Sequence, residues 1–293
     1  MKTKICLFSR TPLAAAPWEL FKALRKYTDL DVSYINKTNR YADGRYFPFH
    51  LLISESNGAC RKALQGAEIL HVHNYWFPLL DDFREGRKVV AQFHSIPRQL
   101  NWAELMENAD ICYTIQQPLH IAEYHLPGLP NLIDPDEYKP IRRPGKIKIA
   151  FAPSSRAPIS SPQSKGYFEV AQILKEVAAE RDVEILWIER QAYETNLKTK
   201  QNAHILIDDV VTGNWHRTSL EGCCFASAVL NKNKMVPFVY ANLKNLKSIL
   251  FNLIDNPAVL QEAQDRARFW VLTKWHPIEQ VKIYENVYRK VTQ

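Results

Sequence analysis

Two basic side chains lie between a strand-like segment and a helix-like segment near the middle of the chain. Arg156 and Lys165 follow the apolar run IAFAP, and the amphipathic run YFEVAQILKEVAAE begins directly after Gly166. A helix N-terminus leaves backbone N–H groups unpaired and carries about half a positive charge. Two cations at such a place can hold an anion such as a phosphate group. The competing interpretation is a solvated basic loop after a strand.

The composition favours an anionic ligand and limits how it can be bound. The formal net charge is +7 and the isoelectric point is near 9.0, which suits nucleotide phosphates, nucleic acid or an anionic membrane face. Only nine glycines occur, and no two are spaced G-x-G. The glycine-rich dinucleotide loop and the Walker loop are therefore excluded, and phosphates must be held by cations and helix ends.

Length and residue content indicate the class of protein. The 293 residues are too many for one ordinary core and suit two α/β domains. No apolar run reaches the roughly 20 residues needed to cross a bilayer, and the apolar stretch near the N-terminus is too short for a signal peptide. The five cysteines show no C-x-x-C spacing. We therefore expect a cytoplasmic protein without a transmembrane segment, a disulfide framework or a zinc knuckle.

Strand-like and helix-like runs alternate along the chain, which predicts parallel sheets with helices on both faces. Strand-like runs occupy 4–9, 31–35, 67–74, 87–95 and 111–115, then 147–153, 183–189, 203–209 and 236–240. The proline-rich segment 126–145 separates the two series and predicts a linker. We expect a first domain over 1–143, a second over 144–270, and a last helical segment over 271–293.

The order of these features resembles a known group of enzymes. A strand, a short loop, Arg156, Lys165-Gly166, and then Glu221 near the start of a later helix are similar to the C-terminal domain of GT-B-fold glycosyltransferases, particularly the retaining family-four group. SRTPLAAAPWELFKALRKYTD, ILHVHNYW, VVAQFHS and PNLIDPDEYKP also resemble segments of this group. The resemblance implies two Rossmann-like doubly wound domains that face each other across a cleft, with the C-terminal helix returning to the first domain.

The chain also departs from the pattern of that group. Members usually carry two glutamates separated by seven residues, and Glu221 matches the second while Gly213 occupies the position of the first. The stretch GCCFASA replaces the usual sequence after the second glutamate. The contact that the first glutamate makes to the transferred sugar must therefore come from elsewhere or be missing.

The resemblance assigns the donor-binding residues. Glu221 is expected to accept hydrogen bonds from the ribose hydroxyls of a nucleotide, because an ionised carboxylate has two acceptor oxygens. Arg156, Lys165 and Gly166, together with the segment Arg217, Thr218, Ser219 and Leu220, are expected to bind the diphosphate. The competing interpretations are a first-turn glutamate favoured by the helix dipole and an ordinary helix cap.

The first domain is expected to supply His94 and the acceptor side. His94 ends a buried strand, where ligands of open α/β sheets bind, and the resemblance implies that it contacts hydroxyls of the donor sugar. A structural histidine is the alternative. Ala14, Ala15 and Ala16 are expected to let ligands approach the backbone. His73, Tyr75 and Trp76 are expected on the acceptor side, with the aromatic rings exposed for stacking or, alternatively, covering the core.

Two other clusters could suggest a metal, and the sequence argues against both. His71 and His73 share one face of a strand, but the segment lacks further ligands. Asp134-Pro135-Asp136 resembles a metal-binding D-x-D, yet it lies in the proline-rich linker and predicts a turn. We expect a reaction that requires neither a metal nor another cofactor.

The resemblance predicts transfer of a sugar from a nucleotide sugar, by default a UDP-sugar, to a hydroxyl group. Arg156, Lys165 and the helix start at 217–220 would stabilise the departing diphosphate, and His94 completes the expected catalytic set. Closure of the two domains would exclude water. A retaining course, in which the leaving phosphate helps to deprotonate the acceptor, is implied by the resemblance alone.

Several acceptors and one other class of function stay open. The acceptor is a saccharide or cell-envelope glycan, or duplex DNA with a hydroxymethylated base that must be flipped into the site. A basic first domain could also make a peripheral contact to an anionic membrane. Gly213 and the altered stretch 222–228 suggest a non-catalytic nucleotide-sugar-binding protein as the alternative. A plain nucleic-acid-binding protein would explain the charge but not the doubled α/β pattern.

Overall fold

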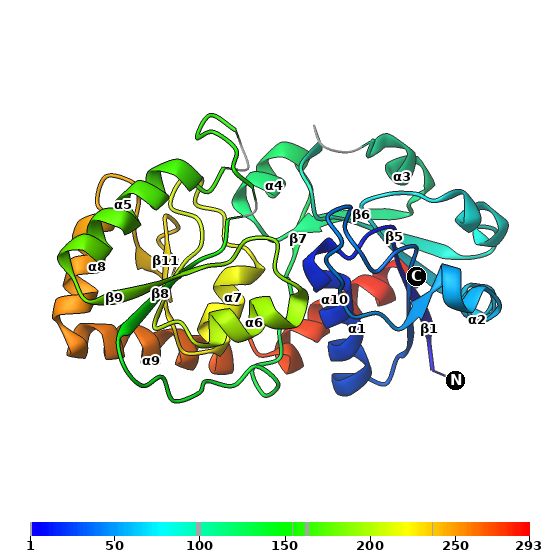
Figure 1. The fold of residues 1–293 in the computed structure, drawn as a ribbon. Coiled ribbons are helices and arrows are strands. Elements are labelled where there is room, and N and C mark those ends of the chain that lie inside the picture. The colour runs from blue at the N-terminus through cyan, green and yellow to red at the C-terminus, as the bar shows by residue number, and fades with distance from the viewer. Residues whose placement is uncertain (1, 98–100, 154, 162–163, 236) are drawn as a thin grey trace. The chain divides into compact units, whose positions relative to one another are not determined.

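The chain divides into two compact units. The computed structural model describes residues 2–97, 101–153, 155–161, 164–235 and 237–293. Unit 1 consists of Met1–Ile133 and His276–Gln293, and unit 2 consists of Asp134–Trp275. Figure 1 shows strands with surrounding helices in both units.

Unit 1 is built on a parallel sheet that has seven strands among the described residues, in the order β3-β2-β1-β4-β5-β6-β7. The register pairs Ser9 with both Asn36 and His73, so the carboxyl ends of β2, β1 and β4 lie in one row. The strands are β1 (Lys4–Ser9), β2 (Asp31–Asn36), β3 (Leu51–Leu52), β4 (Ile69–His73), β5 (Lys88–Phe93), β6 (Ile111–Ile115) and β7 (Gly128–Leu129).

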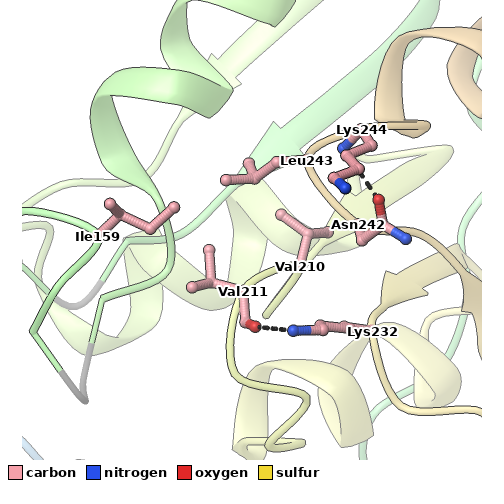
Figure 2. A pocket seen from close by; sticks show the side chains of 7 residues that line it. All are labelled: Ile159, Val210, Val211, Lys232, Asn242, Leu243 and Lys244. Carbon is pink, nitrogen blue, oxygen red and sulfur yellow. Dashed lines mark hydrogen bonds between the residues drawn. The ribbon is translucent and has the colours of Figure 1, made fainter.

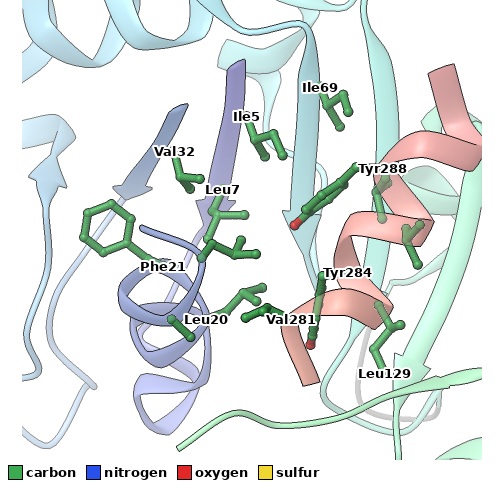
Figure 3. Packing of buried hydrophobic residues seen from close by; sticks show 14 of the residues in the cluster. Ile5, Leu7, Leu20, Phe21, Val32, Ile69, Leu129, Val281, Tyr284 and Tyr288 are labelled. Carbon is green, nitrogen blue, oxygen red and sulfur yellow. The ribbon is translucent and has the colours of Figure 1, made fainter. Parts of the chain in front are cut away.

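The helices of unit 1 cover this sheet, and the last one comes from the end of the chain. They are η1 (Leu13–Ala15), α1 (Ala16–Tyr27), α2 (Ile53–Gly66), η2 (Pro78–Phe83), α3 (Ala103–Asn108), α4 (Pro118–Tyr124) and α10 (Pro277–Thr292). Val281, Tyr284 and Tyr288 recur every three or four residues, so they form one buried face of α10. Figure 3 shows them packed with Leu20 of α1 and Ile5 of β1. The predicted return of the C-terminal helix is confirmed.

Unit 2 is a smaller version of the same design. Its parallel sheet has five strands among the described residues, in the order β12-β11-β10-β8-β9. The strands are β8 (Ile147–Phe151), β9 (Val183–Trp187), β10 (Ile205–Ile207), β11 (Ala228–Asn231) and β12 (Val239–Tyr240). The helices are α5 (Tyr167–Glu180), α6 (Tyr193–Gln201), α7 (Arg217–Cys224), α8 (Leu246–Asp255) and α9 (Pro257–Thr273).

Alternating side chains assign the helices of unit 2 to the two faces of its sheet. Ile149 and Ile207 point to the face where α5 and α8 pack. Leu206 and Val229 point to the other face, where Gly222 of α7 approaches so closely that an added Cβ would lie 2.6 and 2.7 Å from their side chains. The helix α6 contacts α7 on that face.

The strand order reverses once in each sheet, and this predicts where a ligand binds. The reversal lies between β1 and β4 in unit 1 and between β8 and β10 in unit 2. Connections on the two sides of such a switch point turn to opposite faces, which leaves a crevice outside the carboxyl ends of the strands. The residues that follow these four strands are therefore the first candidates for a site.

Two smaller expectations can be compared with the structure. Asp134-Pro135-Asp136 forms a turn, as predicted, with the backbone N–H of Asp136 donating to Oδ1 of Asp134 at 2.9 Å. Within the described ranges, no helix is both long enough and apolar enough to cross a membrane.

Candidate functional site

Lys165 lies at the switch point of unit 2. Its Nζ atom is 2.5 Å from Oδ1 of Asp208 and donates a second hydrogen bond to the carbonyl oxygen of Ala152 at 3.3 Å. Ala152 directly follows β8 and Asp208 directly follows β10, so one ammonium group joins the ends of the two strands. Lys165 is 4% exposed and Asp208 is 0% exposed, which makes this a buried ion pair.

Asp208 holds the start of α7 as well as the lysine. Its Oδ2 atom accepts hydrogen bonds from the backbone N–H of His216 at 2.9 Å and from the hydroxyl of Ser219 at 2.6 Å. Burial alone would raise the pKa of this carboxyl, but Lys165 and then His216 hold the pKa well below its usual range. A carboxylate that stays charged therefore fixes both the Lys165 ammonium and the first turn of α7.

Gly166 precedes α5 in a backbone conformation that favours glycine. Its φ is +70°, in the left-handed region, and it is the N-cap residue of the helix. An added Cβ would lie 2.9 Å from Cγ2 of Val211 and 3.3 Å from Cδ2 of Leu243. A larger residue would therefore meet both backbone strain and a close contact. The Lys-Gly pair combines a buried cation at the sheet edge with the start of a helix.

The predicted segment Arg217, Thr218, Ser219 and Leu220 forms the first turn of α7, and all four side chains are buried. The hydroxyl of Ser219 donates to Asp208, as described above. The guanidinium of Arg217 turns back along its own helix, where Nε donates to Oε1 of Glu221 at 2.8 Å. It also donates to the hydroxyl of Tyr193 at 2.7 Å. The structure thus brings Ser219 to Lys165 through Asp208 and brings Arg217 to Glu221.

Glu221 lies between two cations. Besides the bond from Arg217 to Oε1, the Nζ atom of Lys200 is 2.5 Å from Oε2. Burial would raise the pKa of Glu221, but Lys200 and then Arg217 lower it. Lys200 is 5% exposed, and the sequence did not single it out. Both carboxylate oxygens therefore already accept charge-assisted hydrogen bonds within unit 2.

Arg156 lies apart from this buried network. Its guanidinium donates to both carboxylate oxygens of Glu189, at 3.2 and 2.8 Å, and covers the ring of Tyr167 at 5.0 Å. The Arg156 side chain is 66% exposed. The structure therefore places it as a surface cation near the start of α5, and no contact joins it to Lys165 among the described residues.

A pocket of about 380 Å³ opens beside Gly166. Figure 2 shows its lining: Ile159, Val210, Val211, Lys232, Asn242, Leu243 and Lys244. The Nζ atom of Lys232 donates to the carbonyl oxygen of Val211 at 2.7 Å. Val210, Val211 and Leu243 pack with the α5 and α8 face of the sheet. Glu221, Lys200 and Arg217 lie on the other face of the sheet, with α6 and α7. Lys165 and Asp208, at the sheet edge, therefore lie between this charged cluster and the pocket.

Gly213, at the position of the missing first glutamate, lies in the loop between β10 and α7. Its φ is +81°, and Nδ2 of Asn233 donates to its carbonyl oxygen at 3.0 Å. An added Cβ would meet its nearest atoms at 3.8 Å. Backbone conformation, rather than a lack of space, is what favours glycine here.

Neutral histidines occupy the corresponding edge of unit 1. His73 is the last residue of β4, and His94 directly follows β5. Nδ1 of His73 is 3.0 Å from Nε2 of His94, and Nδ1 of His71 is 2.8 Å from the hydroxyl of Tyr288 on α10. Burial lowers the pKa of His71 and of His94 to about 3, and it lowers the pKa of His73 as well. These rings carry no charge at neutral pH.

The paired histidines of β4 have the wrong geometry for a shared metal ion. His71 and His73 are stacked, with ring centroids 4.5 Å apart and an angle of 24° between the ring planes. Lone pairs of ring nitrogens lie in the ring plane, so stacked rings direct them side by side. A zinc ion needs its nitrogen ligands to converge at about 2.0–2.1 Å.

The predicted acceptor-side residues lie at the carboxyl edge of the unit 1 sheet. Ala14 and Ala15 have positive φ values of +51° and +65° in the tight turn that starts α1, where Ala16 is the first residue. Tyr75 is half-buried beneath the guanidinium of Arg10. Trp76 is only 5% exposed, and its Nε1 donates to Asp81 at 2.7 Å. The expected exposure of Trp76 is wrong, because its indole packs in the core.

Cations stack on aromatic rings along this same edge. Arg10 follows β1 and covers Tyr75 at 5.5 Å, and Lys37 follows β2 and covers Phe77 at 4.8 Å. The loop after β2 adds two further pairs, Arg40 over Tyr46 at 4.2 Å and Arg45 over Tyr41 at 5.0 Å. The Tyr41 hydroxyl accepts a hydrogen bond from the backbone N–H of Ala14, which ties this loop to the turn after β1. We call these four pairs the basic aromatic rim.

Comparison with known proteins gives the fold. No family model and no curated protein sequence matches the chain. Sucrose-phosphate synthase from Thermosynechococcus elongatus matches with a TM-score of 0.63 at 11% identity, over 99% of each chain. The lipopolysaccharide outer core galactosyltransferase WaaB matches at 0.55 and 8% identity, over 98% of this chain and 100% of that one. A UDP-N-acetylglucosamine 2-epimerase matches at 0.53 and 10% identity, over 90% and 91%.

These likenesses confirm the predicted fold class. The chain consists of two parallel-sheet Rossmann-like domains, as in GT-B proteins, with a C-terminal helix in the first. At such identities the likeness establishes the fold alone. The reaction must therefore be argued from the residues at the two switch points.

Proposed function

We propose that the chain is a glycosyltransferase that moves a sugar from a nucleotide sugar to a hydroxyl acceptor. The observation that carries this proposal is the buried Lys165 beside Gly166 at the switch point of unit 2. A cation next to a helix N-terminus suits a diphosphate, and the fold is one that a synthase and a galactosyltransferase share. Unit 2 then binds the donor and unit 1 binds the acceptor.

The layout of unit 2 orders the parts of the donor. By resemblance, Glu221 on the α6 and α7 face binds the ribose, and Lys165 at the sheet edge binds the diphosphate. The sugar then extends past Gly166 toward the pocket on the α5 and α8 face, which is large enough for one hexose. Arg156, exposed near the start of α5, provides a second positive charge that contacts the diphosphate. UDP is the nucleotide that we test first.

The chemistry follows from where charge develops. Breaking the bond between sugar and phosphate leaves negative charge on the diphosphate, and Lys165, Arg156 and the start of α7 can stabilise that charge without a metal. His94, neutral and half-buried at the unit 1 edge, contacts the donor sugar by resemblance. A retaining course belongs to the same proposal, as does membership of the family-four group.

The basic aromatic rim favours an acceptor that carries negative charge. Arg10, Lys37 and Arg40 would contact phosphate or carboxylate groups, whereas Arg45 is already paired with Asp43 at 2.8 Å. Aromatic rings stack on sugars as well as on bases. Of the acceptors expected from the sequence, a cell-envelope glycan that bears acidic groups and DNA with a hydroxymethylated base would both offer such groups. An anionic membrane surface would contact the same cations. Transfer to DNA would fall steeply as salt is raised, because phosphate contacts release counterions.

The alternative function is non-catalytic binding of a nucleotide sugar, and one observation favours it. Both oxygens of Glu221 accept hydrogen bonds from Lys200 and Arg217, so the ribose hydroxyls would have to share or displace these partners. Gly213 removes the other expected carboxylate. Such a protein would bind UDP-sugars and leave them intact.

A donor screen separates these functions. The full chain would be incubated with UDP-, GDP-, ADP- and CDP-sugars, first alone and then with glycan and hydroxymethylated-DNA acceptors, and products identified by mass spectrometry. We expect transfer, with slow hydrolysis of the same donor in the absence of acceptor. Binding without any turnover would favour the non-catalytic alternative. An epimerised nucleotide sugar as the product would show that the chain catalyses epimerisation, the reaction in the name of the 2-epimerase, and not transfer. Failure of every donor to bind would contradict the proposal.

A further inference from the structure

His73 contacts the ring of His94 but is itself sealed from solvent. It is 0% exposed, at the end of β4, and its Nδ1 atom is 3.0 Å from Nε2 of His94. The two rings are tilted by 52°, with centroids 5.1 Å apart. A group with no exposed surface cannot meet a ligand, so its effect on chemistry must pass through His94.

The contact decides which nitrogen of His94 can meet a ligand. An imidazole has two ring nitrogens, each able to make one in-plane hydrogen bond. Nε2 is engaged with His73, whereas no hydrogen bond to Nδ1 is found within the described parts of the chain. His94 is half-buried, not sealed. Nδ1 is therefore the atom that His94 offers to a bound sugar.

His94 is fixed from its backbone as well as from its ring. Its N–H donates to Oδ1 of Asn74 at 2.6 Å, and Asn74 itself adopts a positive φ of +67° and donates to Ser95 at 3.1 Å. His73 in turn is the last residue of β4, where its backbone pairs with Gln92 of β5. With backbone and ring both fixed, the direction of the Nδ1 atom is set before any ligand arrives.

We propose that His73 is a positioning residue that orients His94, so that Nδ1 of His94 rather than Nε2 faces the substrate. In metal sites, an outer residue hydrogen-bonds to the histidine that binds the metal and thereby fixes the orientation of its ring. His73 would fix the ring of His94 in the same way, without a metal. The kinetic part of this inference rests on the proposed function. The orientation part does not, because it concerns only the two rings.

The test compares three buried substitutions. The side-chain amide of asparagine can take the place of Nδ1, through its nitrogen as a donor or its oxygen as an acceptor, so His73→Asn keeps a partner for His94, whereas His73→Leu removes it. His71→Leu is the matched control, because His71 is equally buried in the same strand and makes no hydrogen bond to His94. Transfer would be measured as kcat and KM, and the ring nitrogens of His94 would be observed by ¹⁵N NMR, assigned with His94→Gln.

We expect His73→Leu to lower kcat by about ten- to hundred-fold, while His73→Asn and His71→Leu stay within about three-fold of the unsubstituted chain. The Nε2 signal of His94 should move in His73→Leu and stay in place in His71→Leu. Equal kinetics for the two leucine variants, or an unmoved Nε2 signal in His73→Leu, would overturn the inference. If the unsubstituted chain transfers no sugar, the proposed function fails and the NMR comparison still decides the orientation.

Discussion

The carboxyl edges of the two sheets occupy equivalent places in the topology and differ in their electrostatics. Unit 2 places a buried ion pair there, Lys165 with Asp208, and a second buried pair, Lys200 with Glu221, on the adjoining α6 and α7 face. Unit 1 places neutral groups there, with His73 bonded to His94 and His71 bonded to Tyr288. The same strand order therefore positions a charged site in one unit and an uncharged site in the other.

The difference follows from what each edge can bury. Removing an ion from water is costly unless a partner of opposite charge lies within hydrogen-bonding distance, and each buried ion of unit 2 has such a partner. The histidines of unit 1 avoid the cost by giving up their protons, which is why burial lowers their pKa values. A charged edge suits a diphosphate, and an uncharged edge suits the hydroxyl groups of a sugar.

The largest expected effect comes from removing one charge of unit 2. Lys165→Met leaves the Asp208 carboxylate buried without its main partner, and we expect a loss of about 3–5 kcal/mol in the free energy of unfolding. Lys165→Met combined with Asp208→Asn leaves no unpaired charge and should recover most of that loss. Chemical denaturation of both variants measures the difference. If Lys165→Met were as stable as the double variant, this result would contradict the claim that Lys165 and Asp208 form a tightly coupled ion pair.

A smaller effect is expected where the backbone begins α5. Gly166→Ala must adopt a positive φ, which costs about 1–2 kcal/mol, and must displace Val211, which adds about 1–3 kcal/mol. Gly145→Ala is the matched control in the same unit, because Gly145 has φ +84° and open space around it. Gly145→Ala should lose only the stability that the positive φ costs. Thermal unfolding of the two variants would show whether the close contact matters, and equal losses would count against it.

As pH falls, the two sheet edges should lose their contributions to the free energy of unfolding at different pH values. An unfolded histidine binds a proton near pH 6.5, whereas folded His71 has a pKa of about 3, so the unfolded state gains protons first as pH falls. His71 alone should therefore lower the free energy of unfolding by about 2 kcal/mol between pH 7 and pH 5. Asp208 has a lowered pKa, so its contribution is lost only below the ordinary aspartate pKa of about 3.9.

His71→Asn isolates this contribution. Asparagine keeps a polar group near the Tyr288 hydroxyl and does not titrate. The variant should lose less stability than the unsubstituted chain when denaturation curves at pH 7 and pH 5 are compared. Identical pH dependence of the two proteins would show that His71 is not the acid-sensitive group.

The smallest effect on stability is expected at Arg156. Its pair with Glu189 is exposed, and exposed pairs of this kind contribute little to folding. Arg156→Gln should therefore unfold like the unsubstituted chain but bind UDP-sugars roughly ten-fold more weakly. Glu189→Gln breaks the same pair and keeps the cation, so it should leave donor affinity unchanged. Equal affinity in both variants would remove Arg156 from the donor site.

Much of the fold could be predicted from local patterns. The run KICLFS gives β1 with the bounds expected, the amphipathic run after Gly166 predicts α5 closely, and α10 lies within the helical segment expected over 271–293. The sequence pattern does not indicate the strand β11, because Ala228–Asn231 is buried on both faces and shows no alternation between apolar and polar residues. It does not indicate the polar helix α6 for the opposite reason, since YETNLKTKQ has no apolar stripe.

The candidate site could be predicted only in part. Lys165, Gly166 and Glu221 stood out because they lie next to recognisable strand and helix ends. Lys200 reads as a surface lysine, and only the folded chain brings it to Glu221, 21 residues away. Asp208 offered one usable signal, an acidic residue directly after a buried strand. That signal could have suggested a partner for Lys165, 43 residues earlier.

The central claim is that Lys165 binds a nucleotide diphosphate and does more than neutralise Asp208. Titration calorimetry with UDP would measure this in the unsubstituted chain and in the variant that combines Lys165→Met with Asp208→Asn. We predict that the unsubstituted chain binds UDP and that the folded double variant binds it at least about ten-fold more weakly, because one charged hydrogen bond is lost. Equal affinity in the two folded proteins would contradict the claim.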